Sequence, residues 1–161
     1  MLIEVTVVTV ILPLVVFLLL RSIGKISTIM APKIKERKMP LVIQCFLVIV
    51  LIKKGITVGL YPEFHFFFLA GLMSTLLALG LLFAKIKASL HMIGISALTF
   101  FIFGLNLHAN NQNVVLIAVL FMINGLVALS RIEMRAHTPK ELAIGFVLGS
   151  LPQFLLMYLW L

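Results

Sequence analysis

Aspartate is absent from this chain of 161 residues, and its single cysteine, Cys45, lies inside an apolar run. One cysteine excludes an intramolecular disulfide and a thiolate metal site. Without aspartate, and with only four scattered histidines, a metal cluster is not expected either. Charged residues make up only 11% of the chain, and all five acidic residues are glutamate. This shortage of charge excludes an ordinary soluble domain, and the chain has no pattern typical of nucleic-acid binding.

Hydrophobic residues, in contrast, make up 63% of the chain, and the mean hydropathy is +1.25. Six apolar runs approach the ~20 residues that a helix needs to cross the hydrocarbon core of a membrane. They are residues 2–20, 41–60, 64–84, 92–107, 114–129 and 142–161. The first run lacks a preceding basic segment and a cleavage site, so we interpret it as a span and not as a removable signal peptide. The sequence therefore predicts an all-α fold, with one transmembrane domain over residues 1–161 that forms a six-helix bundle.

The first connection, residues 21–40, is the longest and the most basic. Isoleucine and methionine recur in it at helical spacing between lysines and arginines. This pattern predicts a short basic helix in the membrane interface, broken at Pro32. Most of its cations are expected to contact anionic headgroups, although the final segment KIKERKMP is more densely charged than anchoring requires.

Six spans place alternate connections on the same membrane face, and the charges are divided very unevenly between the two faces. The odd connections carry eleven of the thirteen cations, and the even connections carry only Lys53 and Lys54. The eleven are Arg21, Lys25, Lys33, Lys35, Arg37, Lys38, Lys85, Lys87, Arg131, Arg135 and Lys140. His91 and His137 also lie in odd connections, and the other two histidines are assigned interfacial roles only. We expect the odd connections to converge on one face and to suit a phosphate-bearing substrate.

The densest group of chemically useful side chains is the segment SRIEMRAHTPKE, residues 130–141. Arg131 can bind a phosphate through two donors, and His137 can attack phosphorus or move a proton. Glu141 can accept a hydrogen bond from the imidazole and fix its tautomer. Thr138, followed by proline, is also typical of a helix start with Glu141 at the capping-box position. Glu141 is therefore open to two roles, cap and tether, and the whole segment is alternatively a basic anchoring loop.

These residues resemble the type 2 phosphatidic acid phosphatases, a superfamily of lipid phosphate phosphatases and vanadium haloperoxidases, as a divergent small bacterial-type member. The family has three motifs, KxxxxxxRP, PSGH and SRxxxxxHxxxD. The third is similar to residues 130–141, with Glu141 in place of aspartate, and the second is similar to ASLH, residues 88–91, with Leu90 in place of glycine. The first is not matched at its spacing, because Met39 and Pro32 stand where arginine and lysine are expected.

The resemblance implies six helices with the motifs on one membrane face, and hydrolysis of a lipid phosphate without a metal or other cofactor. It implies that His137 attacks phosphorus, that Glu141 orients His137, and that His91 protonates the leaving oxygen and then activates water. The phosphate-binding residues that it implies are Arg131, Ser89, Arg37, Lys38 and Lys33.

The sequence thus predicts a membrane lipid phosphatase that hydrolyses a phosphomonoester or diphosphate of a lipid. Candidate substrates are phosphatidate, phosphatidylglycerol phosphate, a polyprenyl diphosphate and the phosphates of a lipid A. The alternatives are a non-catalytic relative that binds lipid phosphates and, ranked last, a small transporter, because polar residues within the spans are few and mild. We expect a multi-pass protein of a bacterial inner (cell) membrane, with membrane lipids as partners and no nucleic acid. The charge bias predicts a cytoplasmic motif face, whereas most relatives work on the outer face, and both orientations stay open.

Overall fold

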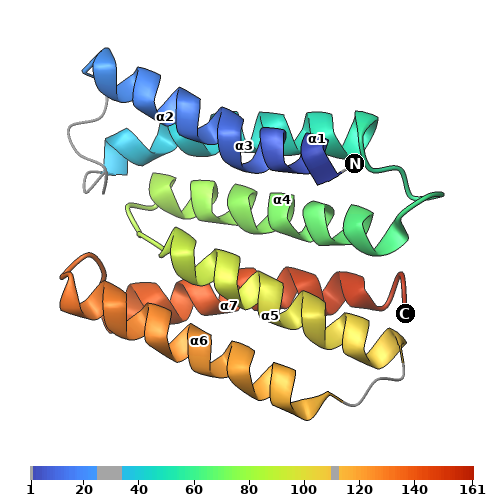
Figure 1. Cartoon of the computed structure of the whole chain (residues 1–161). Coiled ribbons are helices and arrows are strands. Elements are labelled where there is room, and N and C mark those ends of the chain that lie inside the picture. Colours follow the sequence, from blue (N-terminus) through green and yellow to red (C-terminus); the bar gives the residue numbers. More distant parts are fainter. Residues whose placement is uncertain (1, 25–33, 110–112) are drawn as a thin grey trace. The chain divides into compact units, whose positions relative to one another are not determined.

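The structure is a computed structural model that describes residues 2–24, 34–109 and 113–161. Over these residues the protein is all-helical, with no strand, as the sequence predicted. The chain divides into two compact units, Met1–Lys85 and Ile86–Leu161 (Figure 1). Five of the described helices are long and apolar enough to cross a membrane, which is the helix content of a multi-pass membrane protein.

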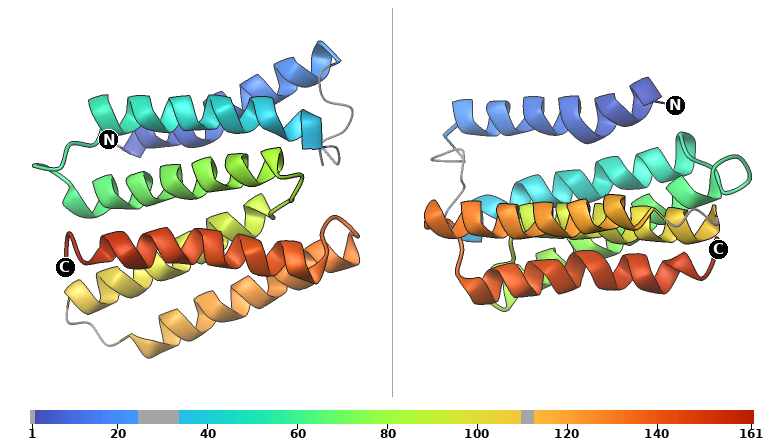
Figure 2. Two further views of the ribbon diagram at one scale, coloured as in Figure 1. Left: turned by 180° about the vertical axis from the view of Figure 1, so that it is seen from behind. Right: turned by 60° about the horizontal axis from the view of Figure 1, so that its bottom comes forward.

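The first unit combines a long N-terminal helix with a pair of helices that pack on each other. Its elements are α1 (Leu2–Thr6), the π-helical turn η1 (Val7–Ile11), α2 (Leu12–Ser22), α3 (Ile34–Lys54) and α4 (Pro62–Phe83). The widened turn η1 lies just before Pro13, whose ring would clash with the carbonyl four residues earlier in a regular helix. Within this unit, α3 and α4 run in opposite directions, so the start of α3 and the end of α4 lie at the same end (Figure 2).

Helix α3 differs from the expected layout. The sequence predicted an interfacial helix over residues 21–40 and a separate span over residues 41–60, whereas α3 continues without interruption through Pro40. A proline in a helix interior costs ~3 kcal/mol, but Pro40 lies in the second turn of α3 and membrane helices tolerate proline. The expected break at Pro32 lies outside the described residues.

The charge at both ends of α3 decides whether it counts as a membrane span. Helix α3 has Lys35, Glu36, Arg37 and Lys38 in its first two turns and Lys53 and Lys54 at its end, and it is not among the five helices that are apolar enough to cross a membrane. The second span expected from the sequence is thus not one of the five. The first expected span is covered by the N-terminal helix and the third by α4.

The second unit contains α5 (Leu90–His108), α6 (Val114–Glu133) and α7 (Pro139–Met157). These helices overlap the last three expected spans, but α6 ends four residues later than residue 129, and α7 begins and ends a few residues earlier than residues 142–161. Helix α5 packs most extensively along α7, and it is joined to α6 by a hydrogen bond of 2.6 Å from Asn124 Nδ2 to Thr99 Oγ1. Within this unit the start of α5 and the α6–α7 turn lie at the same end (Figures 1 and 2).

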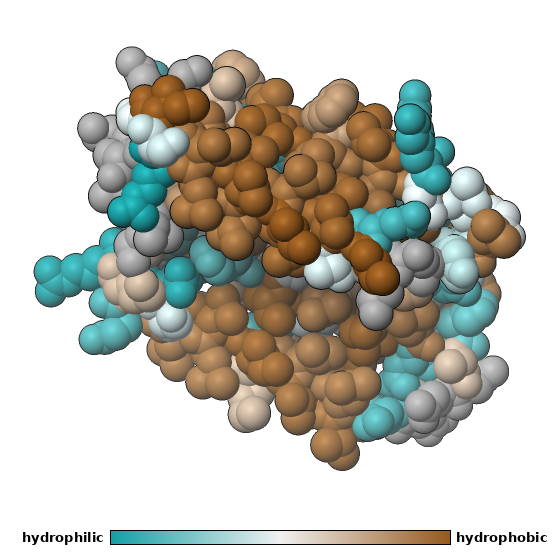
Figure 3. Space-filling view, turned by 45° about the horizontal axis from the view of Figure 1, so that its top comes forward, coloured by the Kyte–Doolittle hydropathy of each residue, from teal (hydrophilic) through white to brown (hydrophobic). Residues whose placement is uncertain are grey.

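The outer faces of the helices are apolar. Large side chains such as Met122 and Leu129 of α6 are exposed, as lipid-facing side chains are when no membrane is present. Hydrophobic surface covers the middle of the helices in Figure 3, and the hydrophilic side chains gather near helix ends. This distribution places the charged residues where helices meet the membrane surface.

Candidate functional site

The turn between α6 and α7 is built by backbone hydrogen bonds at the end of α6. Arg135 has a φ of 49°, its N–H donates to Ile132 O at 2.8 Å, and the N–H of Ala136 donates to Arg131 O at 3.0 Å. This pair of bonds is a Schellman motif, in which a left-handed residue ends a helix. It fixes Arg131 in the last turn of α6 and places His137 directly after the turn.

Helix α7 then begins with a complete capping box, which confirms the prediction made for Thr138. The N–H of Glu141 donates to Thr138 Oγ1 at 3.3 Å, and the N–H of Thr138 donates to Glu141 Oε2 at 3.3 Å. Pro139 follows the cap at the first helical position, where the missing N–H has no intrahelical partner in any case. The segment between Arg131 and Glu141 is therefore held at both ends by local hydrogen bonds.

The same glutamate oxygen also holds the histidine. Glu141 Oε2 lies 2.7 Å from His137 Nδ1, so one oxygen accepts from both the backbone of Thr138 and the imidazole. The histidine side chain is 5% exposed and the glutamate side chain 22% exposed. Because an ionised carboxylate only accepts, Nδ1 is the donor of this bond, and Nε2 is the ring nitrogen that Glu141 does not bind. Glu141 is thus both a cap and a tether.

Arg131 has a donor without an acceptor. Its Nη2 donates to Ser130 Oγ at 3.3 Å, but its Nε is buried and has no hydrogen-bond partner among the described residues. Buried donors are nearly always paired in folded proteins. An oxyanion is a good acceptor for the fork of a guanidinium group, so this unsatisfied N–H suits a phosphate oxygen.

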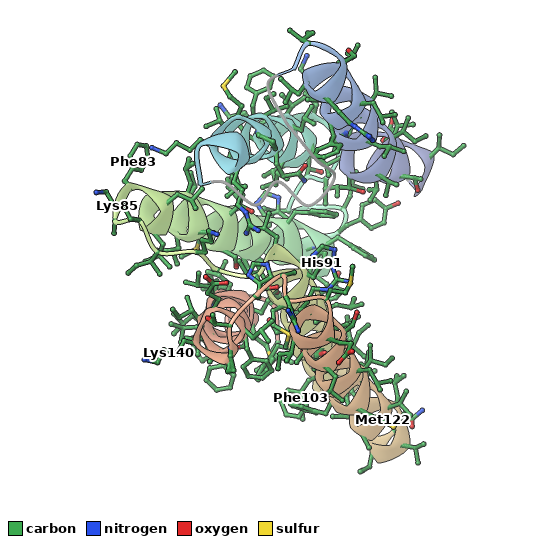
Figure 4. All side chains as sticks on the ribbon, turned by 90° about the vertical axis from the view of Figure 1, so that its left-hand side faces the viewer. Phe83, Lys85, His91, Phe103, Met122 and Lys140 are labelled. Carbon is green, nitrogen blue, oxygen red and sulfur yellow. The ribbon has the colours of Figure 1, made fainter. Side chains whose placement is uncertain are left out.

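The segment similar to the second motif lies against the start of α7. Ser89 is fully buried and is the N-cap of α5, and its Oγ accepts the N–H of Met92 at 3.4 Å. Its own N–H donates to the backbone O of Glu141 at 3.2 Å. His91 lies on the first turn of α5 and is exposed (Figure 4). The structure therefore joins the segments similar to the second and third motifs through the backbones of Ser89 and Glu141, within one unit.

The cations expected from the first motif belong to the other unit. Lys33 lies outside the described residues, and Arg37 is half-buried near the start of α3. Lys38 Nζ lies 4.2 Å from the centroid of the Phe83 ring, at the end of α4 (Figure 4). A cation in this position is attracted by the face of the ring, which gives Lys38 a partner within its own unit.

Sequence reasoning overlooked Gly145 of α7, which faces the first turn of α5. The available signal was the spacing of Gly145 and Gly149, since small residues four apart mark close helix packing in membranes. Which helix packs against these glycines, however, is known only from the structure.

No protein-family model matches this sequence, and searches among curated proteins and solved structures also gave no match. The function proposed below is therefore inferred from the side chains of the second unit and from the chemistry that they support.

Proposed function

We propose that this protein is a metal-independent membrane lipid phosphatase that forms a phosphohistidine at His137. The observation that carries the proposal is the 2.7 Å hydrogen bond between His137 Nδ1 and Glu141 Oε2. A nucleophilic side chain needs a neighbour that fixes its orientation and proton, and this carboxylate does both. The buried, unpaired Nε–H of Arg131 in the same turn supports an anionic substrate.

The proposed reaction has two balanced steps. His137 Nε2 attacks phosphorus, the bond from phosphorus to the lipid oxygen breaks, and His91 gives its proton to that oxygen. Water, deprotonated by His91, then attacks the phosphohistidine, and the bond from phosphorus to nitrogen breaks to release inorganic phosphate. Glu141 stabilises the positive charge that develops on the imidazole during attack, while Arg131 binds the phosphoryl oxygens.

The substrate is proposed to be a phosphomonoester or diphosphate of a lipid. The expected site residues of the second unit lie at helix ends, where a headgroup meets the membrane surface, and the apolar outer faces of the helices suit acyl chains. Fixed cations can neutralise the phosphate charge, and Arg37 and Lys38 remain proposed contributors. We place the protein in a bacterial inner membrane as part of this proposal.

The six-helix bundle belongs to the proposal as well. Helix α3 has 21 residues, which at 1.5 Å per residue gives ~31 Å, enough to cross a hydrocarbon core of ~30 Å. Lysines at its ends can extend their ammonium groups to the membrane surface while the chain between them stays in the lipid. Six crossings then place all three odd connections on one face, and the charge bias favours the cytoplasm.

A reporter fused after Leu161 tests this topology, because six crossings with a cytoplasmic motif face put the C-terminus outside. Activity of a periplasmic reporter is expected, and activity of only a cytoplasmic reporter would contradict the proposed orientation.

The polar residues within the helices argue against a transporter. Ser74, Ser96 and Thr99 each donate to a backbone carbonyl of their own helix at 2.7–2.9 Å. Asn124 joins α6 to α5. The hydroxyl bonds satisfy polar groups within one helix and the Asn124 bond joins two helices, so packing accounts for these side chains without a substrate path.

One observation favours the second candidate, a non-catalytic protein that binds lipid phosphates. Ser89 is fully buried beneath the turn in which Leu90 replaces the glycine of the resembling motif. A side chain at that position narrows the approach of a phosphate to the backbone. If this candidate is correct, the protein binds lipid phosphates and does not hydrolyse them.

The test is phosphate release by the purified protein in detergent from phosphatidate, phosphatidylglycerol phosphate and a polyprenyl diphosphate, beside His137→Ala. We expect release by the wild type from at least one lipid, no release by the variant, and no loss in EDTA. A folded wild type that binds these lipids and releases no phosphate would replace the proposal with the binding protein. Loss of activity in EDTA would contradict the metal-free mechanism.

A further inference from the structure

Gly145 lies in the second turn of α7, at a very close approach to the first turn of α5. A Cβ atom at this position would lie 2.8 Å from Ser89 O, 2.9 Å from Met92 Cβ and 3.2 Å from Ser89 N. Two of these three atoms belong to the backbone, which cannot rotate aside as the end of a long side chain can. Any other residue at position 145 must therefore push the start of α5 away from α7.

We infer that Gly145 is a positioning residue that sets the His91-bearing turn of α5 against the Glu141-bearing turn of α7. The effect on kcat that this inference expects rests on the proposed function, whereas the effect that it expects on the structure does not. Gly145 contacts no substrate in this account. It acts through the distance between two backbone segments, each of which carries a residue of the proposed mechanism.

The contacts form a short, continuous path. The N–H of Ser89 donates to Glu141 O at 3.2 Å, and the side chain of Glu141 holds His137 at 2.7 Å. His91 is two residues beyond Ser89 on the same helical turn, so it moves when that backbone moves. A displacement at Gly145 thus changes the position of the proposed acid, His91, relative to the proposed nucleophile, His137. A misplacement of ~1 Å can cost ~10²-fold in rate.

The experiment compares Gly145→Ala in α7 with the same substitution at two glycines of α5. Gly94 has no atom within 4 Å of an added Cβ, and the atoms nearest to an added Cβ at Gly104 belong to the side chains of Met157 and Trp160. We expect Gly145→Ala to lower kcat by ~10–100-fold with KM changed by less than ~3-fold. We expect wild-type kcat for Gly94→Ala, and for Gly104→Ala a lower Tm with wild-type kcat.

The structural readout uses the imidazole ¹⁵N resonances of protein labelled in its histidines. Gly145→Ala should move the resonances of His91 and His137, and Gly94→Ala and Gly104→Ala should leave them in place. Unchanged resonances in Gly145→Ala, or equal loss of kcat in Gly104→Ala at equal loss of Tm, would overturn the positioning role. A wild type without phosphatase activity overturns only the proposed function, because the resonances still decide the role of Gly145.

If Gly145→Ala does not fold, Ser89→Pro tests the same contact from the side of α5, because the proline ring replaces the N–H and its Cδ meets Glu141 O. Ser89 has a φ of −79°, which proline can adopt, and proline lacks the N–H that donates to Glu141 O. Ser89→Ala is the matched control, because it loses the hydroxyl and keeps the N–H. The inference expects Ser89→Pro to move the His91 resonance further than Ser89→Ala does, and equal shifts would overturn it.

Discussion

The two ends of the α5–α7 pair are packed by different means. At the end that carries the motifs, backbone approaches backbone beside Gly145, and hydrogen bonds join Ser89, Glu141 and His137. At the opposite end, Trp160 is 8% exposed, and its ring lies over Gly104 with its centroid 5.9 Å from that of Phe101. One end is thus positioned by directional bonds and the other by aromatic packing.

The same difference is seen in the surroundings of two histidines, one at each end. His137 is nearly buried and shares a hydrogen bond with a carboxylate, whereas His108 is exposed, with its ring centroid 6.0 Å from that of Trp160. The residue type is the same, but the burial and the neighbour differ. A carboxylate fixes the proton of an imidazole, while an aromatic ring does not. The partner of a histidine therefore predicts its chemistry better than the histidine alone.

The largest expected difference in kcat is between substitutions of the two histidines at the ends of α5. His91→Ala should lower kcat by ~10²–10⁴-fold, because it removes the proposed general acid. The loss should be greater for an alkyl lipid phosphate than for nitrophenyl phosphate, whose leaving group needs less protonation. His108→Ala should keep kcat within ~2-fold of the wild type. Equal losses of kcat in the two variants, measured by phosphate release, would contradict the difference in role between His91 and His108.

Trp160→Ala should act on stability and leave chemistry intact. Removal of a large buried aromatic side chain costs ~3–5 kcal/mol, so we expect a clearly lower Tm in detergent. The kcat of the remaining folded protein should match that of the wild type, because Trp160 lies at the end opposite to the site. A fall in kcat at a temperature where the variant is folded would show that the two ends are coupled.

The two roles of Glu141 can be separated by two substitutions. Glu141→Gln keeps a side chain that can complete a capping box but loses the negative charge, so we expect a kcat ~10-fold lower with little change in Tm. Thr138→Ala loses the N-cap hydroxyl and should cost ~1 kcal/mol of stability, with a smaller effect on kcat. If Glu141→Gln instead lowers stability with no separate effect on kcat, the tether has no catalytic role.

The smallest effect concerns the left-handed residue of the α6–α7 turn. Arg135 has a φ of 49°, a conformation that glycine adopts without the steric cost of a side chain. Arg135→Gly should therefore raise the free energy of unfolding by ~1 kcal/mol. The kcat should not change, since Arg135 has no role in the proposed mechanism. A large loss of activity in this variant would instead add Arg135 to the site.

The sequence predicted those parts of the structure that depend on local pattern. Long apolar runs located α4–α7, and the Thr-Pro-x-Glu pattern located the start of α7 with its cap. The boundary that the sequence placed at Pro40 lies inside α3, because a proline among charges resembles a helix end unless the following turns stabilise the helix. Features that depend only on residues close in sequence were predictable, and features that depend on more distant residues were not.

The sequence named candidate site residues, but their contacts came only from the structure. Arg131, His137 and Glu141 are recognisable by spacing, yet the sequence offered capping and tethering as alternatives for Glu141. In the structure the glutamate side chain is long enough for one oxygen to accept both bonds. The contact of Gly145 with Ser89 depends on which helices pack together, and no pattern within a single segment specifies that.

The most direct test of the account is to trap the phosphorylated intermediate. Protein incubated with a lipid phosphate that it hydrolyses would be quenched at alkaline pH, where phosphohistidine survives, and its peptides examined by mass spectrometry. The account predicts a phosphoryl group on His137 in the wild type, more of it in His91→Ala because its hydrolysis is slowed, and none in His137→Ala. Phosphate release by the wild type with no phosphoryl group on His137, or undiminished release by His137→Ala, would contradict the account.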